Sequence, residues 1–106
     1  MTEEKYPVRN LADAVAYQED AIVSKTVMNK DAGSVTLFAF DKGQELSEHT
    51  SPYDALVTIL DGVSEITISG HPVRVKAGEM IIMPADEPHA LTAVERFKMM
   101  LVMIRS

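Results

Sequence analysis

Apolar and polar residues alternate with a period of two along most of the chain, which is typical of β-strands that expose one face to water. The clearest case is residues 73–76, reading VRVK, where two valines share one face and two cations share the other. Clusters of Asp, Gly and Pro separate the alternating runs and favour turns. The pattern predicts strands at residues 21–28, 35–40, 55–60, 63–68, 73–76, 80–83, 89–94 and 97–104.

Many short strands at regular spacing indicate an all-β fold, either an antiparallel sandwich or a barrel. Asp61-Gly62 is read as the turn of a hairpin between the runs at 55–60 and 63–68. A chain of 106 residues fits one domain. We therefore expect one domain over residues 1–106, with the barrel at residues 21–104.

Residues 1–20 are expected to form an N-terminal extension that contains one short helix. Asn10 is its candidate cap, because a short polar side chain can accept a hydrogen bond from a free backbone N–H. Leu11, Ala14 and Val15 are expected on its buried side.

Two predicted strands are apolar on both faces. Residues 55–60 and 99–104 place large aliphatic side chains at adjacent positions, so the alternation is lost. Such a strand must be covered on both sides. One face can fill a barrel, and the other needs a second sheet or a second subunit. In so short a chain we favour the subunit and expect a homodimer.

The composition excludes several classes of protein. Ten basic and sixteen acidic residues give a formal charge of −6, which would repel a nucleic acid backbone. The chain has no cysteine, so thiolate chemistry and disulfides are excluded. No apolar run approaches the ~20 residues that a membrane helix needs, and the N-terminus does not read as a signal peptide. We expect a cytoplasmic protein that binds neither nucleic acid nor membrane.

Two glycine-anchored segments resemble the paired motifs of the cupin superfamily. The first is residues 43–62, reading GQELSEHTSPYDALVTILDG. The first cupin motif has a glycine, two histidines in His-x-His, a glutamate and a closing glycine. Gly43, His49 and Gly62 match it, while Ser51 replaces the second histidine and Ala55 replaces the glutamate.

The second segment is residues 78–93, reading GEMIIMPADEPHALTA. Gly78, Pro84 and His89 match the second cupin motif, while Asp86 replaces its inner glycine and Ala93 its asparagine. The resemblance implies a small single-domain cupin of the conserved-barrel type. Its expected fold is an antiparallel jelly-roll barrel, also called a double-stranded β-helix.

The resemblance also implies an incomplete metal site. A metal-binding cupin holds iron, manganese, nickel or zinc with three histidines and one glutamate, and leaves positions open for substrate. Only His49 and His89 remain here as candidate metal ligands. Ser51 offers a weak neutral oxygen and Ala55 offers no donor. Spacing indicates no replacement among the nearby residues Glu48, Tyr53, Asp54 and Glu87.

The two histidines are also expected to line a pocket at the barrel mouth. Even without metal, paired imidazoles can act as a general base, a proton shuttle or an anchor for a ligand carboxylate. Strand parity places small or apolar residues around them, which favours a small and partly apolar ligand. The predicted pocket residues are His49, Ser51, Tyr53, Ala55, Val57, Met83 and His89.

Three functions fit this sequence. The leading hypothesis is a small-molecule-binding cupin with a degenerate metal site at the barrel mouth. The second is a metal-dependent oxygenase, isomerase or decarboxylase that uses His49 and His89. The third is a non-catalytic accessory module. The fold alone does not separate them, because one scaffold hosts many activities.

Overall fold

Eight antiparallel strands make up most of this computed structural model, which describes residues 5–105. A short 3-10 helix, η1 (Ala12–Ala14), precedes them. No helix in the described part of the chain is long and apolar enough to cross a membrane. The strands are β1 (Ile22–Lys30), β2 (Gly33–Phe40), β3 (Glu45–His49), β4 (Asp54–Ile68), β5 (His71–Lys76), β6 (Met80–Met83), β7 (His89–Thr92) and β8 (Phe97–Ile104).

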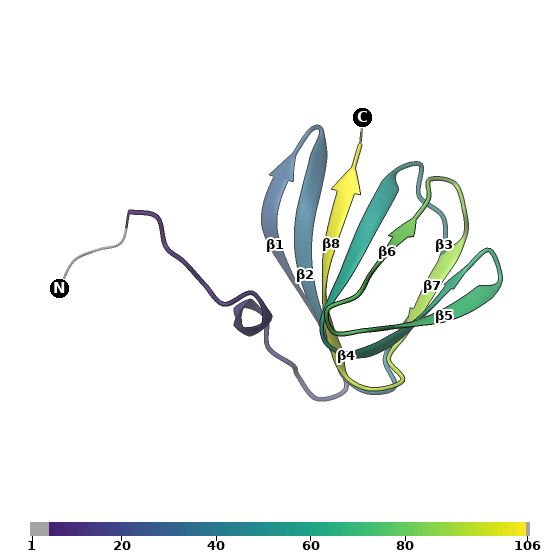
Figure 1. Cartoon of the computed structure of the whole chain (residues 1–106), viewed down its shortest axis with the longest axis horizontal. Coiled ribbons are helices and arrows are strands. Elements are labelled where there is room, and N and C mark those ends of the chain that lie inside the picture. The colour runs from purple at the N-terminus through teal and green to yellow at the C-terminus, as the bar shows by residue number, and fades with distance from the viewer. Residues whose placement is uncertain (1–4, 106) are drawn as a thin grey trace.

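The long strand β4 belongs to two sheets. Its first half pairs with β8 and β6, and β8 continues through β2 to β1, which gives a five-stranded sheet. Its second half pairs with β5 and β7, and β7 continues to β3, which gives a four-stranded sheet. Figure 1 shows the two sheets spreading apart from the bend of β4. The expected antiparallel jelly-roll barrel is confirmed.

Gly62 marks the bend of β4, where the sequence pattern had predicted a hairpin turn. That prediction is wrong, because the strand continues from Asp54 to Ile68 without a break. Gly62 has a φ of +75°, and a Cβ there would overlap the backbone carbonyl of Arg96. An Asp-Gly pair supplies positive φ to a hairpin, and it supplies the same freedom to a bend inside a strand. Here both halves of the strand have partners, so the bend persists.

The strand β3 is missing from the predicted runs. Its residues are mostly exposed and polar, so no apolar run marks it. Backbone pairing with β7 defines it instead, through Glu45 opposite Thr92 and His49 opposite His89. The strand therefore brings the first histidine segment beside the second.

The core lies between the two sheets and is built from alternate residues of each strand. On β4, Val57, Ile59 and Ile66 are almost completely buried. Phe40 and Phe97 stack with ring centroids 4.4 Å apart. This packing closes the interior near the bend and leaves room toward the ends of β3 and β7, where the two histidines lie.

The N-terminal segment crosses the outer face of the five-stranded sheet. Val15 is buried there and packs in one cluster with Leu37 and Ala39, but it follows η1 in an extended conformation and does not belong to the helix as expected. The N-cap residue of η1 is Leu11 and not the expected Asn10, although Asn10 Oδ1 accepts a hydrogen bond from the backbone N–H of Asp13 at 3.3 Å. Leu11, expected to be buried, is 42% exposed because the 3-10 turn is only three residues long.

Candidate functional site

His49 and His89 meet at the end of the ladder between β3 and β7. The two residues are direct cross-strand partners. Their Nε2 atoms lie 3.1 Å apart, and the rings meet edge to face at 71°. Residues 40 positions apart in the sequence are therefore brought together by strand pairing.

The other ring nitrogen of each histidine contacts a backbone carbonyl. His49 Nδ1 lies 2.8 Å from the oxygen of Ser47, and His89 Nδ1 lies 3.2 Å from that of Glu87. A carbonyl oxygen can only accept, so both Nδ1 atoms must donate. A neutral imidazole carries a single N–H, so both Nε2 atoms then present lone pairs to each other. The geometry favours a proton shared by the two Nε2 atoms, a hydrogen-bond donor of a bound ligand, or a cation between them.

The two imidazoles differ in their exposure to solvent. His89 is only 5% exposed, whereas His49 lies in an exposed position. Burial lowers the pKa of His89 below its ordinary value, and the neighbouring His49 lowers it further, while the Glu87 carbonyl acts in the opposite direction. The buried member of the pair is therefore biased toward the neutral form, with a lone pair on Nε2.

A cavity of about 130 Å³ opens beside the pair. Five predicted pocket residues line it: His49, Ser51, Ala55, Met83 and His89. Its remaining wall comes from apolar side chains that the motif comparison did not indicate. These are Phe38, Leu46, Leu91, Met99, Leu101 and Met103.

Two predicted pocket residues lie elsewhere. Val57 faces inward, as its parity indicates, but it is fully buried in the core and does not line the cavity. The backbone N–H of Tyr53 donates to Ser51 Oγ at 3.2 Å, and Tyr53 is also absent from the cavity wall. Tyr53 lies between β3 and β4, outside both strands, so strand alternation does not set its direction.

The two Nε2 atoms lie at the spacing of two adjacent ligands of a metal ion. For metal–nitrogen bonds of about 2.0–2.1 Å, adjacent ligands lie roughly 2.9–3.4 Å apart, and the Nε2 separation falls within this range. Among residues 5–105, however, no group of three His, Cys, Asp or Glu side chains could hold a metal ion. Asp54 instead accepts a hydrogen bond from the backbone of Ala85, and Glu87 accepts one from Ser69. The donor set does not fit a firmly held ion.

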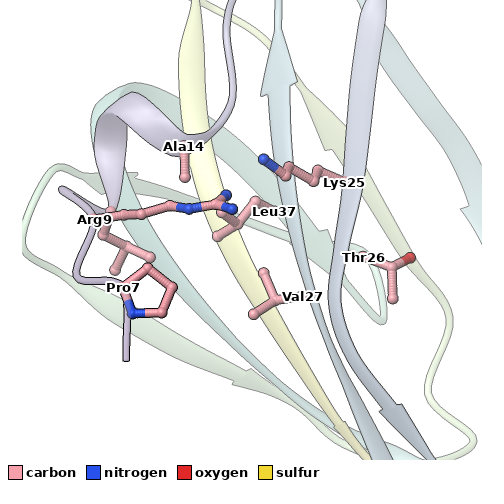
Figure 2. Close-up of a pocket in the computed structure, with 8 residues that line it drawn as sticks. Pro7, Arg9, Ala14, Lys25, Thr26, Val27 and Leu37 are labelled. Carbon is pink, nitrogen blue, oxygen red and sulfur yellow. The ribbon is translucent and has the colours of Figure 1, made fainter. Parts of the chain in front are cut away.

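A second hollow, of about 360 Å³, lies between the N-terminal segment and strands β1 and β2. Figure 2 shows Arg9 and Lys25 extending into it from opposite sides above Leu37. This hollow contains no histidine and has no connection to the motifs. It shows that residues before η1 pack only loosely against the barrel.

Comparison with known proteins identifies the family to which this fold belongs. The family model described as "Cupin domain" matches residues 36–105. A search of curated protein sequences finds no match to the chain.

Several solved structures share the fold. A conserved protein of unknown function from Streptococcus pyogenes is 44% identical, over 98% of this chain and 91% of that one, with a TM-score of 0.92. A cupin 2 conserved barrel domain protein from Leptotrichia buccalis is 45% identical, over 92% of this chain and 47% of that one, with a TM-score of 0.89. A cupin superfamily protein from Desulfitobacterium hafniense is 26% identical, over 98% of this chain and 94% of that one, with a TM-score of 0.90. The chain therefore belongs to the cupin family.

Proposed function

We propose that this cupin binds a small, mostly apolar molecule in the cavity beside His49 and His89. The observation that carries the proposal is the pair of backbone contacts to the Nδ1 atoms, because they direct both Nε2 atoms to one point at the cavity. A buried polar group needs a partner, and a ligand can supply it.

The chemistry of the cavity limits the ligand class. Its walls are aliphatic, aromatic or thioether groups except at the histidines and Ser51. The volume of about 130 Å³ corresponds to roughly four water molecules, or one small ring. Two Nε2 lone pairs prefer an O–H donor, and if the proton passes to an imidazole the resulting N–H can hold the anion. A small carboxylic acid or phenol satisfies both requirements.

The test is a titration followed through the imidazole resonances of ¹⁵N-labelled protein. Benzoate and phenol are the probes, and benzene is the apolar control that lacks a polar group. We expect benzoate or phenol to shift the resonances of His49 and His89 and to bind at least about tenfold more tightly than benzene. The His49→Ala/His89→Ala variant should lose that preference. The His71→Ala variant, which removes an exposed histidine, should keep it.

Failure of the probes would count against this ligand class. If neither probe binds, or if binding is unchanged in the double variant, the pair does not recognise such a ligand. If the His49→Ala/His89→Ala variant also binds metals no differently from the parent, the third hypothesis, a non-catalytic accessory module, is the better account.

The Nε2 separation favours a second candidate, a metal-dependent oxygenase, isomerase or decarboxylase. The two nitrogens lie at the spacing of adjacent metal ligands, so substrate or water oxygens would have to complete the shell. Elemental mass spectrometry of untagged protein separates the two candidates. Near-stoichiometric iron, manganese, nickel or zinc, lost in the double variant, would support the enzyme. Trace metal in both proteins, with no binding on addition, would leave the ligand-binding proposal.

A further inference from the structure

Three methionines border the same cavity as the paired histidines. Met83 of β6 and Met99 and Met103 of β8 line it together with His49 and His89. The chain has seven methionines in all, so a large share of them gathers at one small cavity. Thioether sulfur is a soft metal ligand. The cavity therefore offers sulfur donors in addition to the two imidazoles.

Strand register places two of these methionines on either side of Ala55. Ala55 of β4 lies opposite Met83 of β6 and, on its other edge, opposite Met103 of β8. Directly opposed residues of antiparallel strands share a face, and Ala55 is itself buried and lines the cavity. Met99 lies opposite Ile59, closer to the core, so we regard it as a wall residue. At the position where the family motif has a glutamate, this chain has a small residue flanked by two thioethers.

The histidine pair already supplies two ligand atoms at a suitable separation. The Nε2 atoms lie 3.1 Å apart, and both Nδ1 atoms donate to backbone carbonyls, so both Nε2 lone pairs are free to bind one ion. His89 is buried, whereas His49 is exposed. An ion arriving from solvent can therefore meet His49 first and reach the buried nitrogen from it.

The remaining donors select the kind of ion. No third His, Cys, Asp or Glu completes a metal site among residues 5–105, and the Ser51 hydroxyl is the only side-chain oxygen among the described lining residues. The Born cost of moving an ion out of water rises with the square of its charge, so a divalent ion costs about four times as much as a monovalent ion of equal size. Cu(I) is monovalent and accepts both thioether and imidazole ligands. It therefore fits this apolar site better than Zn²⁺ or Fe²⁺ does.

We propose that the cavity binds one Cu(I) ion through His49 Nε2, His89 Nε2 and the thioether sulfurs of Met83 and Met103. Methionine has a flexible, unbranched side chain, so both sulfurs can adjust to the ion, and Ala55 leaves space between them. The donors and the ion both differ from the histidine and glutamate set that holds a divalent ion in this family. Cu(I) and the small molecule proposed above use the same Nε2 lone pairs, so this proposal does not rest on the earlier one.

Competition with a chromophoric chelator tests the site. Untagged, metal-free protein is titrated without oxygen against the Cu(I) complex of ferrozine, with ascorbate as the reductant. We expect the parent to take up one Cu(I) per chain and to bind Zn²⁺ at least about 100-fold more weakly. The His49→Ala/His89→Ala variant should lose this uptake. Met83→Leu/Met103→Leu should bind Cu(I) at least about tenfold more weakly, because leucine keeps the volume and removes the sulfur.

Met80→Leu is the matched control. Met80 belongs to the same strand as Met83 but is 69% exposed, so this variant should bind Cu(I) like the parent. A second measurement needs no site variant. In parent protein with ¹³C-labelled methionine methyl groups, Cu(I) should shift the resonances of Met83 and Met103 and leave that of Met80 in place.

Three results would each overturn the copper proposal. These are equal affinity for Zn²⁺ and Cu(I), unchanged Cu(I) binding by Met83→Leu/Met103→Leu, and Cu(I) uptake that persists in the double histidine variant. The phenol and benzoate titration separates this proposal from the earlier one. Binding of phenol or benzoate without uptake of Cu(I) removes only the copper site, and uptake of Cu(I) without binding of either probe removes only the small-molecule ligand.

Discussion

His49 Nε2 lies 3.1 Å from His89 Nε2, and the Nδ1 atom of each imidazole contacts the backbone carbonyl two residues earlier in the chain. The local backbone therefore orients each ring, while strand pairing sets the distance between them. Ring orientation and the distance between the rings therefore have separate structural causes.

Stability should rise with pH through the titration range of His89. Its folded pKa lies below the value of 6.5 in the unfolded chain, so the unfolded state binds more protons between these two values. The contribution of His89 to the free energy of unfolding is fully present above pH 6.5. It falls as the pH drops toward the folded pKa and is constant below that pKa. Urea unfolding at pH 5.0 and 7.5 measures the difference. His89→Gln should show a smaller difference than the parent, and an equal one would contradict the assignment.

Restoring the two missing family ligands should create a firm metal site. Ser51 and Ala55 both line the cavity beside the histidine pair, so Ser51→His/Ala55→Glu adds an imidazole and a carboxylate on the correct side. Calorimetry should show at least about a 100-fold gain in affinity for Zn²⁺ or Ni²⁺. The same change in a His49→Ala/His89→Ala background should gain far less. No gain in either protein would mean that the four positions do not converge.

Gly62→Ala should destabilise the protein strongly. The new Cβ would meet the Arg96 carbonyl in a backbone conformation with φ of +75°, so both strain and overlap oppose it. We expect a loss of about 3 kcal/mol or more in urea unfolding. Gly70→Ala is the matched control, because Gly70 has a similar φ of +80° but open space around its Cα. It should lose only about 1 kcal/mol, and equal losses would remove the overlap from the explanation.

Tyr17→Phe should loosen the N-terminal segment. The Tyr17 hydroxyl donates to Asp61 Oδ2 at 2.6 Å, and the Arg96 guanidinium stacks on the ring with its carbon 3.8 Å from the centroid. Burial and the Asp61 carboxylate raise the pKa of this phenol. Phenylalanine keeps the stacking and loses the hydrogen bond, so we expect a cost of about 1 kcal/mol. Hydrogen exchange of residues 12–17 should quicken, while exchange in β7 should not.

The alternation of residues was sufficient to predict most strands, since one-sided burial imposes a period of two. It failed at β3, whose side chains are mostly exposed and whose existence depends on pairing with β7. The Asp-Gly turn signal failed at Gly62, because an Asp-Gly pair has the same local preference in a hairpin and in a bend. The partner strands decide between them.

The family spacing predicted His49 and His89, but it could not supply the apolar wall of the cavity. Met99, Leu101 and Met103 lie at alternate positions of β8, a parity that could have indicated them. Their strand is apolar on both faces, however, so sequence parity alone does not say which set faces inward. Only the register with β4 settles this.

The sequence by itself determined the all-β class and the two histidines with their missing companions, because these follow from the periodicity of the residues and from their chemistry. Tertiary structure decided that the two Nε2 atoms meet and that Val57 and Tyr53 lie outside the cavity. These relationships join residues far apart in the chain. Their geometry is set by strand register and the bend at Gly62, which no local pattern encodes.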